Sequence, residues 1–160
     1  MNIEILQADY TNVEHAKDIL YLLNSYAKDP MGGGEELSQY AKENLVSSLK
    51  QIPHAITILA YVNSKPAGLI NAFEAFSTFK SKPLLNIHDL AVLQEYRGKG
   101  LSQEMLQKIE EIAIAKGCCK LTLEVLSKNK PAKSSYIKFG FKNYELNPST
   151  GIAEFMEKEI

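Results

Sequence analysis

Hydrophobic positions along the chain follow two spacings, which predict strands and helices in a fixed order. Residues that alternate between hydrophobic and polar indicate strands, and hydrophobic residues spaced three or four apart indicate helices. The expected strands are 2–5, 55–62, 67–76, 85–93, 121–125, 141–146 and 152–157. The expected helices begin near Thr11 or Asn12, near 35, at 101 and at 131, and they end near 27, 50, 116 and 139. This order predicts an α/β (α+β) three-layer fold, in which four helices flank a mixed, mostly antiparallel sheet of about seven strands.

The stretch from Leu85 to Met105 has the pattern of a strand, a tight turn and a helix. Its turn, Arg97-Gly98-Lys99-Gly100, supplies two glycines and two cations. The first amides of a helix have no partner inside it, and the helix dipole adds roughly half a positive charge there, so this turn could hold a phosphate. By themselves, Arg97 and Lys99 fit a solvated surface turn better.

Length and charge limit the classes of protein to consider. A chain of 160 residues can close one good core, so a single domain over 1–160 is expected. The 18 Lys and Arg residues nearly balance the 19 Asp and Glu residues, which gives no reason to expect nucleic acid or a membrane as a partner. No segment is apolar enough to span a bilayer and the first residues lack the features of a signal peptide, so a cytoplasmic protein is expected.

The only two cysteines, Cys118 and Cys119, are adjacent in the chain. We expect them to be reduced and to pack as small hydrophobic residues. A metal site would need further Cys or His at ligand spacing, and the nearest histidine in sequence is His88, so no metal is expected.

The segment 28–34, Lys-Asp-Pro-Met-Gly-Gly-Gly, is the most flexible sequence of the chain. Its three glycines permit unusual backbone angles and raise the entropy that is lost on ordering. Two interpretations fit it equally: a plain loop, or a lid that orders over a ligand.

Two motifs stand at a specific distance along the chain. Residues 97–102 are similar to the pattern Arg/Gln-x-x-Gly-x-Gly/Ala after a strand, although Ser102 departs from its last position. Serine is small enough for a first helical turn, so phosphate binding is expected to survive. The second pattern, Asn-x-x-Ala-x-x-x-Tyr-x-x-x-Gly-Phe, is matched at Asn129, Ala132, Tyr136, Gly140 and Phe141. A lone glycine turn is weak evidence, but the two motifs in this order resemble those of the GNAT superfamily of acyl-CoA-dependent N-acyltransferases.

The resemblance implies a GNAT fold and an N-acetyltransferase that takes its acetyl group from acetyl-CoA. It places the pyrophosphate on the backbone amides of about 97–102, and the pantetheine arm between the strands that end near Val92 and Leu126. The residues implied in cofactor binding are Leu90, Ala91, Val92, Arg97, Gly98, Lys99, Gly100, Leu101, Ser102, Asn129, Lys133 and Tyr136. Asn129 could also cap the short helix that follows it.

The implied reaction needs a base, because a primary amine with a pKa near 10.4 is mostly protonated at pH 7. Members of the family often place a glutamate on the fourth strand, where this chain has Asn86 and His88. Asn86 cannot be a base and is expected to contact the substrate. Histidine ordinarily titrates near pH 6.5, so His88 could be the base; its alternative is a core histidine bonded to backbone. Strand alternation predicts that Asp89 faces the opposite side, with a structural or substrate-orienting role. Glu74 could hold a cationic amine or be a solvated strand residue.

The reaction also releases the thiolate of CoA, which needs a proton or a hydrogen-bond donor. The resemblance assigns this role to Tyr136. Its phenol would donate a proton to the thiolate or stabilise it by hydrogen bonding. The alternative is a half-buried tyrosine that fills helix packing.

The leading hypothesis is direct attack by the amine of a small molecule or peptide on acetyl-CoA in a ternary complex. No residue in the sequence indicates that the reaction passes through a covalent acyl-enzyme. The rival is a catalytically weak acyl-CoA-binding sensor or interaction module of the same fold, which Asn86 and Ser102 favour. A phosphoryl-transfer enzyme is a weaker option, because the loop Gly-x-x-x-x-Gly-Lys-Ser/Thr is missing. Analogy alone suggests a homodimer through the terminal strands.

Overall fold

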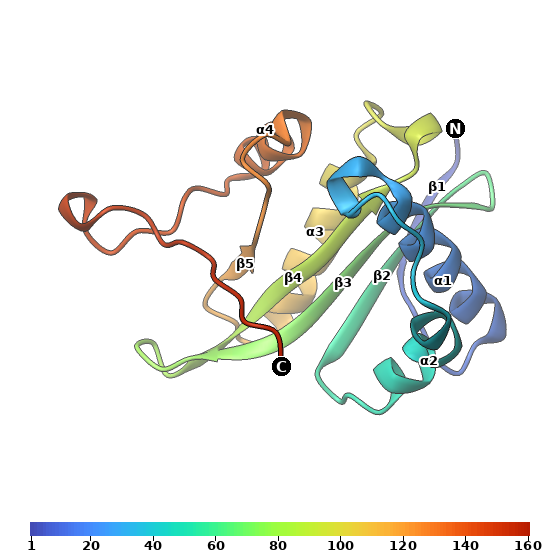
Figure 1. Ribbon diagram of the computed structural model, residues 1–160, viewed down its shortest axis with the longest axis horizontal. Coiled ribbons are helices and arrows are strands. Elements are labelled where there is room, and N and C mark those ends of the chain that lie inside the picture. The colour runs from blue at the N-terminus through green and yellow to red at the C-terminus, as the bar shows by residue number, and fades with distance from the viewer. The chain divides into compact units, whose positions relative to one another are not determined.

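All 160 residues of the chain are described by the computed structural model, which divides into two compact units, Met1–Leu126 and Ser127–Ile160 (Figure 1). The first unit holds a β-sheet with three α-helices, and the second holds one α-helix. No helix of the chain is both long enough and apolar enough to cross a membrane.

Five strands form the sheet of the first unit and lie side by side in chain order. They are β1 (Ile3–Gln7), β2 (Ala55–Val62), β3 (Lys65–Ser77), β4 (Lys82–Val92) and β5 (Leu121–Leu123). Strands β1 to β4 are antiparallel neighbours, and β5 joins the edge of β4 in parallel orientation. The two residues between β2 and β3, Asn63 and Ser64, have φ values of 49° and 61°. Positive φ at both positions is the backbone of a turn that suits the twist of a tight hairpin.

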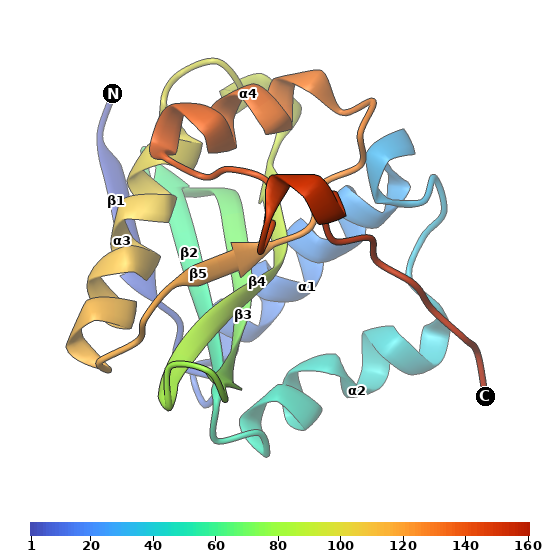
Figure 2. The ribbon, with the colours of Figure 1, turned by 90° about the vertical axis from the view of Figure 1, so that its left-hand side faces the viewer.

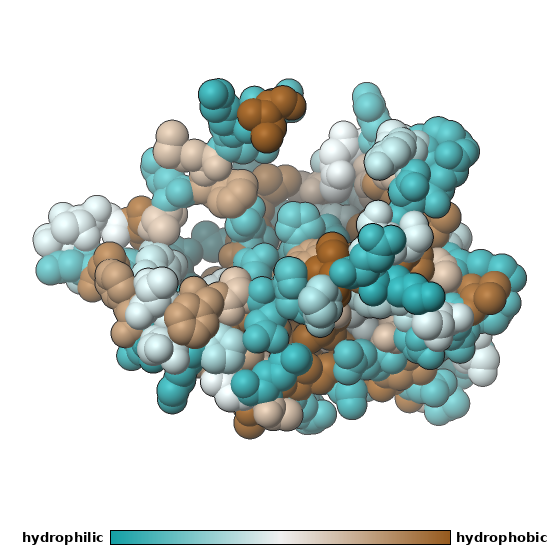
Figure 3. Space-filling model, turned by 90° about the horizontal axis from the view of Figure 1, so that it is seen from below, coloured by the Kyte–Doolittle hydropathy of each residue, from teal (hydrophilic) through white to brown (hydrophobic).

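Helices cover both faces of this sheet (Figure 2). They are α1 (Val13–Lys28) and α2 (Gln39–Lys50) on one face and α3 (Leu101–Ala115) on the other. Ile19 and Leu22 of α1 are buried with Leu59 and Leu69 of the sheet, which forms the core on the α1 side. Seen from below, the surface carries hydrophobic side chains in small areas between hydrophilic ones (Figure 3).

Side-chain caps decide where the first two helices begin. The side chain of Asn12 accepts hydrogen bonds from the first amides of α1, so the expected cap at Thr11 or Asn12 is confirmed at Asn12. Helix α2 begins at Gln39, several residues after the position near 35 that the sequence predicts. The side chain of Ser38 caps it, and the amide of Leu37 is already bonded to Asn24 Oδ1 at 3.0 Å.

The glycine-rich connection between α1 and α2 is bonded to the end of α1. Its residues Pro30–Gly32 form a 3₁₀ turn (η1), in which the Asp29 carboxylate accepts from the amide of Met31 at 2.9 Å. A Cβ at Gly32 would overlap the carbonyl of Tyr26, so only glycine fits there. The connection therefore folds back on α1 in this structure, which leaves both sequence interpretations of it open.

The second unit contains α4 (Lys130–Phe139), with Pro131 in its first turn and the Asn129 side chain as its N-cap. Gly140 ends the helix with a φ of 117°, a conformation that favours glycine.

The sequence prediction of about seven strands is wrong, because the sheet has five. Residues 141–146 and 152–157 form no strand, although the Ala153 amide donates to the Tyr144 carbonyl. Phe155 and Met156 are adjacent rather than alternating, and both are exposed. A two-stranded hairpin without a buried face is marginally stable in water, which explains the absence of these strands.

Candidate active site

The turn between β4 and α3 has the geometry of an anion-binding site. A 3₁₀ turn, Gln94–Tyr96 (η2), leads into it, and Gly98 and Gly100 have φ values of 73° and 84°. A Cβ on either glycine would meet nothing within 4 Å, so their backbone angles rather than crowding require glycine. Gly100 is the N-cap of α3 and no side chain caps the helix. An acceptor from outside the chain can therefore approach the first turn of α3.

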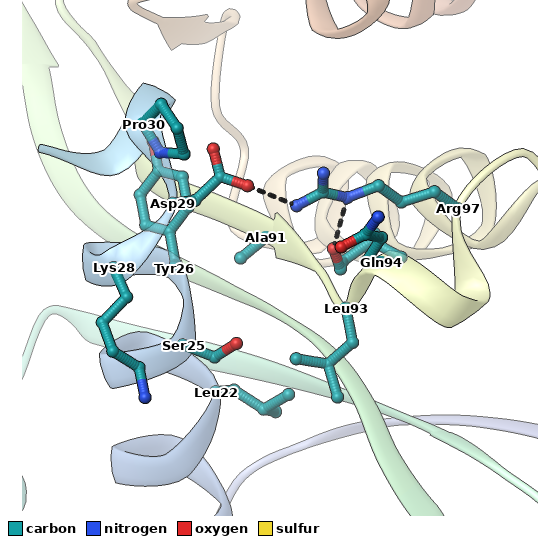
Figure 4. Close-up of a pocket in the computed structure, with 11 residues that line it drawn as sticks. Leu22, Ser25, Tyr26, Lys28, Asp29, Pro30, Ala91, Leu93, Gln94 and Arg97 are labelled. Carbon is teal, nitrogen blue, oxygen red and sulfur yellow. Dashed lines mark hydrogen bonds and ion pairs between the residues drawn. The ribbon is translucent and has the colours of Figure 1, made fainter. Parts of the chain in front are cut away.

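The cation of Arg97 is held by the end of α1 (Figure 4). Its Nη2 atom lies 2.9 Å from Asp29 Oδ2, and its Nε donates to the carbonyl of Val92 at 2.9 Å. The Arg97 hydrogen bond, together with the Met31 amide and the charge of Arg97, lowers the pKa of Asp29 below its usual range. Lys99 donates to the carbonyl of Glu95 at 2.8 Å. The two cations of the motif thus bind protein groups, and their roles toward a phosphate stay predictions.

A cavity of about 330 Å³ lies beside the Arg97–Asp29 pair. Figure 4 shows Leu22, Ser25 and Tyr26 of α1 on one side of it and Ala91, Leu93 and Gln94 on the other.

Strand β4 has a neighbour on only one side along its second half. Its pairing with β5 covers Leu85–Ile87 alone, whereas β3 pairs with it as far as Val92. Leu90, Ala91 and Val92, three of the expected cofactor residues, lie in this stretch. Backbone groups on the β5 side of this stretch are where an extended ligand could add to the sheet.

A β-bulge in β4 changes the side on which Asp89 lies. Asn71 of β3 pairs with Asp89, but the next residue, Ala72, pairs with Ile87, so His88 is an extra residue. One extra residue reverses the alternation of side chains beyond it. The prediction that Asp89 faces away from His88 is therefore wrong, and both side chains line one cavity.

That cavity, of about 380 Å³, lies between α1, α2 and the sheet. We call it the acceptor cavity. Its hydrophobic walls are Leu23, Leu37, Leu45, Leu49 and Phe73, and its polar residues are Tyr26, Asn71, His88 and Asp89. His88 is exposed and meets the ring of Phe73 edge-on, with ring centroids 6.0 Å apart, so it is not a core histidine.

A chain of hydrogen bonds crosses the sheet and ends at Asp89. Tyr10 Oη lies 2.9 Å from Thr57 Oγ1, Thr57 Oγ1 donates to Asn71 Oδ1 at 2.7 Å, and Asn71 Nδ2 donates to Asp89 Oδ2 at 3.0 Å. Thr57 and Asn71 are 1% and 3% exposed. Because the only hydroxyl hydrogen of Thr57 goes to Asn71, Tyr10 must donate to Thr57. Each of these three hydrogen bonds is therefore donated in the direction of the Asp89 carboxylate.

Tyr26 lines both cavities. Burial raises the pKa of its phenol, and the negative charges of Asp89 and Asp29 raise it further. Tyr26 is therefore a neutral phenol between two carboxylates.

Two other expected substrate residues do not line the acceptor cavity. Glu74 follows Phe73 in β3, so alternation turns it away, and it pairs with Lys116 at 3.3 Å. Asn86 donates to Thr122 Oγ1 at 2.9 Å and links β4 to β5. The structure thus gives Glu74 and Asn86 partners within the protein, and their roles toward a substrate stay predictions.

The remaining expected site residues, Asn129, Lys133 and Tyr136, belong to the second unit. Asn129 caps α4, while Tyr136 is buried and its ring meets Phe141 edge-on at 6.0 Å. Their roles toward a cofactor stay predictions.

Burial raises the pKa of the Cys118 thiol, with a contribution from the charge of Glu74. A raised pKa lowers the fraction of reactive thiolate, which argues against this thiol as a nucleophile. The structure contains no group of three or more His, Cys, Asp or Glu side chains placed to hold a metal ion.

Sequence reasoning missed Asn71, Thr57, Tyr26 and the partner of Arg97. Asn71 and Thr57 are polar residues inside apolar strands, and that signal could have been used. Tyr26 and Asp29 carried no comparable signal, because their partners are distant in sequence.

A family model and curated proteins match parts of this chain. The model of the "Acetyltransferase (GNAT) family" matches residues 19–141. The "Thialysine N-epsilon-acetyltransferase" of Bos taurus is 38% identical over 66 residues, which are 41% of this chain and 38% of that protein. The Caenorhabditis elegans protein of the same name is 32% identical over 78 residues, or 49% of this chain and 48% of that protein. The match thus spans less than half the length of these curated relatives.

Solved structures share the fold. A "probable acetyltransferase" aligns with a TM-score of 0.79 at 18% identity, covering 98% of this chain and 99% of that chain. An aminoglycoside acetyltransferase from an uncultured soil metagenomic sample, in complex with sisomicin, aligns with a TM-score of 0.79 at 14% identity, covering 99% of this chain and 97% of that chain.

Replacing Asp29 by asparagine should lower stability only above the titration range of its carboxyl. The folded-state pKa of Asp29 is lowered, so its contribution is present above the unfolded pKa of about 3.9 and is lost as pH falls through the folded value. At pH 7 we expect Asp29→Asn to cost less than about 1 kcal/mol, because Arg97 is half-exposed. Urea unfolding at pH 7 and pH 3 measures this difference.

Glu35→Gln is the matched control, since it removes one negative charge from the same connection and no ion pair. A loss for Asp29→Asn that does not shrink between pH 7 and pH 3, or an equal loss for Glu35→Gln, would contradict the assignment to the Arg97 pair.

Proposed function

The chain belongs to the GNAT acetyltransferase family, and on that premise we propose that it transfers the acetyl group of acetyl-CoA to a primary amine by direct attack in a ternary complex. The observation that carries the proposal is the bulge in β4. It brings His88 and Asp89 into one cavity at the point where β4 loses β5 as a neighbour. A ligand on that strand edge would thus end beside a base and a carboxylate.

The turn 97–102 fits the pyrophosphate of acetyl-CoA. Its two left-handed glycines leave open space, and no side chain caps the start of α3, where the helix dipole favours an anion. Leu90, Ala91 and Val92 would hold the pantetheine arm through their backbone groups. Asn129, Lys133 and Tyr136 are carried into the proposal by the family motif. When bound, acetyl-CoA supplies the activated acyl group.

His88 is the proposed base. At pH 7 a primary amine with a pKa near 10.4 is unprotonated in about one of a few thousand molecules. Removing its proton therefore costs roughly 4 to 5 kcal/mol of free energy. His88 is exposed at the acceptor cavity and can take the proton directly or through a water. Tyr136 would donate to the leaving thiolate.

The amine can belong to a small molecule or a peptide. A cytoplasmic location, which the sequence features predict, and a homodimer, which analogy alone suggests, complete the proposal.

The proposal is tested by release of CoA thiol from acetyl-CoA over a panel of primary amines. We expect release that depends on the amine, with the N-acetylated amine found by mass spectrometry. Tight acetyl-CoA binding without amine-dependent release would instead favour an acyl-CoA sensor.

Substitution of His88 by alanine should lower turnover at pH 7 by roughly 10² to 10⁴, because general-base catalysis typically contributes that much. The loss should shrink toward pH 9 as the amine loses its proton without help. His54→Ala is the matched control, since His54 meets the same Phe73 ring at 6.3 Å but does not line the cavity. Full activity of His88→Ala from pH 6 to 9 would remove His88 as the base.

Tyr136→Phe should slow turnover by about ten- to a thousandfold, because the leaving thiolate loses its hydrogen-bond donor. Binding of acetyl-CoA, measured by calorimetry, should change little. An unchanged rate would exclude Tyr136 from the mechanism.

A further inference from the structure

The walls of the acceptor cavity narrow the class of amine that fits it. Five large hydrophobic side chains line it, and Asp89 is the only carboxylate among its lining residues. No Lys or Arg lines it. Its volume of about 380 Å³ is at the small end of ligand pockets, which run from about 300 to 1,000 Å³.

Asp89 is built to receive one cation. Asn71 Nδ2 donates a hydrogen bond to the Oδ2 atom of Asp89. The orientation of Asn71 is fixed in turn by the bond from Thr57, which accepts from Tyr10. The amide of Asn71 cannot turn without losing the bond from Thr57, so Asp89 has a defined position. The remaining lone pairs of the carboxylate can accept hydrogen bonds from an ammonium group.

Other charged groups on an acceptor would have no partner in this cavity. A second ammonium would lie against Leu37, Leu45 or Leu49, and burial of an unpaired charge in apolar surroundings is costly. A carboxylate would meet Asp89 with no Lys or Arg in the cavity to offset it. Glu36, the nearest candidate in sequence for a second anion, is paired with Lys42 at 2.7 Å and does not line the cavity.

We infer that the acceptor is a small primary monoamine with an apolar body, an alkylamine or aralkylamine, whose ammonium binds Asp89 while its body lies against the leucines and Phe73. The inference rests on the proposed function and names the substrate class of that site. It disfavours polyamines, aminoglycosides and free amino acids as acceptors.

The wild-type protein tests this with pairs of amines of matched length. Hexylamine is compared with 1,6-diaminohexane, and 2-phenylethylamine with phenylalanine, by kcat/KM for thiol release. Each monoamine should exceed its more charged partner by at least about tenfold, because the added charge is left unpaired. Preference for the diamine or the amino acid would overturn the inference.

A substitution in the hydrophobic wall of the acceptor cavity tests whether this wall sets the preference for monoamines. Leu45→Glu places a second carboxylate in the cavity and should raise the ratio of diamine to monoamine kcat/KM by about tenfold or more. Tyr40→Glu is the matched control, because it adds the same charge to α2 at a side chain that is 76% exposed and outside the cavity. It should leave the ratio unchanged, and an equal shift in both variants would count against the cavity as the acceptor site.

Calorimetry separates failure of the inference from failure of the proposed function. Binding of hexylamine and 1,6-diaminohexane is measured in the presence of CoA, without any acetyl transfer. A protein that acetylates no amine but binds hexylamine more tightly would lose the proposed function and keep the inference. A protein that acetylates amines but binds the diamine more tightly would lose the inference alone.

Discussion

One extra residue in β4 determines which side chains meet in the first unit. Without the bulge, Asp89 would follow regular alternation and lie on the α3 side, away from Asn71. With it, Asp89 faces Asn71 and shares a cavity with His88. The extra residue, His88, follows Ile87, the last residue of β4 that pairs with β5. The register change therefore breaks no hydrogen bonds between β4 and β5. The candidate base and the candidate cation-binding group both depend on this irregularity.

The end of α1 connects this cavity to the glycine turn. Tyr26 forms part of the wall of both cavities, and Asp29, three residues later, binds Arg97 at the turn. An anion at the turn would compete with Asp29 for the guanidinium of Arg97, because a phosphate and a carboxylate accept the same donors. Displacement of Asp29 would act on the connection that supplies Gly32 to the acceptor cavity. The residues from Tyr26 to Gly32 thus contribute to the walls of both cavities.

Local signals allowed the sequence to predict the order of elements through α4, a cap at Thr11 or Asn12, and the glycine turn. The bulge could not be predicted, because Asn86-Ile87-His88-Asp89 looks like regular alternation and only the pairing with β3 reveals the extra residue. The Asp29–Arg97 pair joins residues 68 positions apart, with no pattern to connect them. The last two strands were expected from apolar residues alone, but adjacent Phe155 and Met156 cannot both face one side of a strand.

The hydrogen-bonded series Tyr10–Thr57–Asn71–Asp89 adds little to the stability of the fold, and its main effect is to fix the position of the Asp89 carboxylate. Each of its members is bonded, and the structure leaves no buried side-chain nitrogen or oxygen without a partner. Exchanging both partners of a satisfied buried hydrogen bond for apolar side chains of the same shape can be nearly neutral, but apolar residues at positions 57 and 71 would also leave Tyr10 Oη and Asp89 Oδ2 without these partners. What apolar residues could not do is fix a direction. This series of bonds delivers one donor to Oδ2 of Asp89 and leaves the other lone pairs of the carboxylate available for the ammonium group of the proposed acceptor.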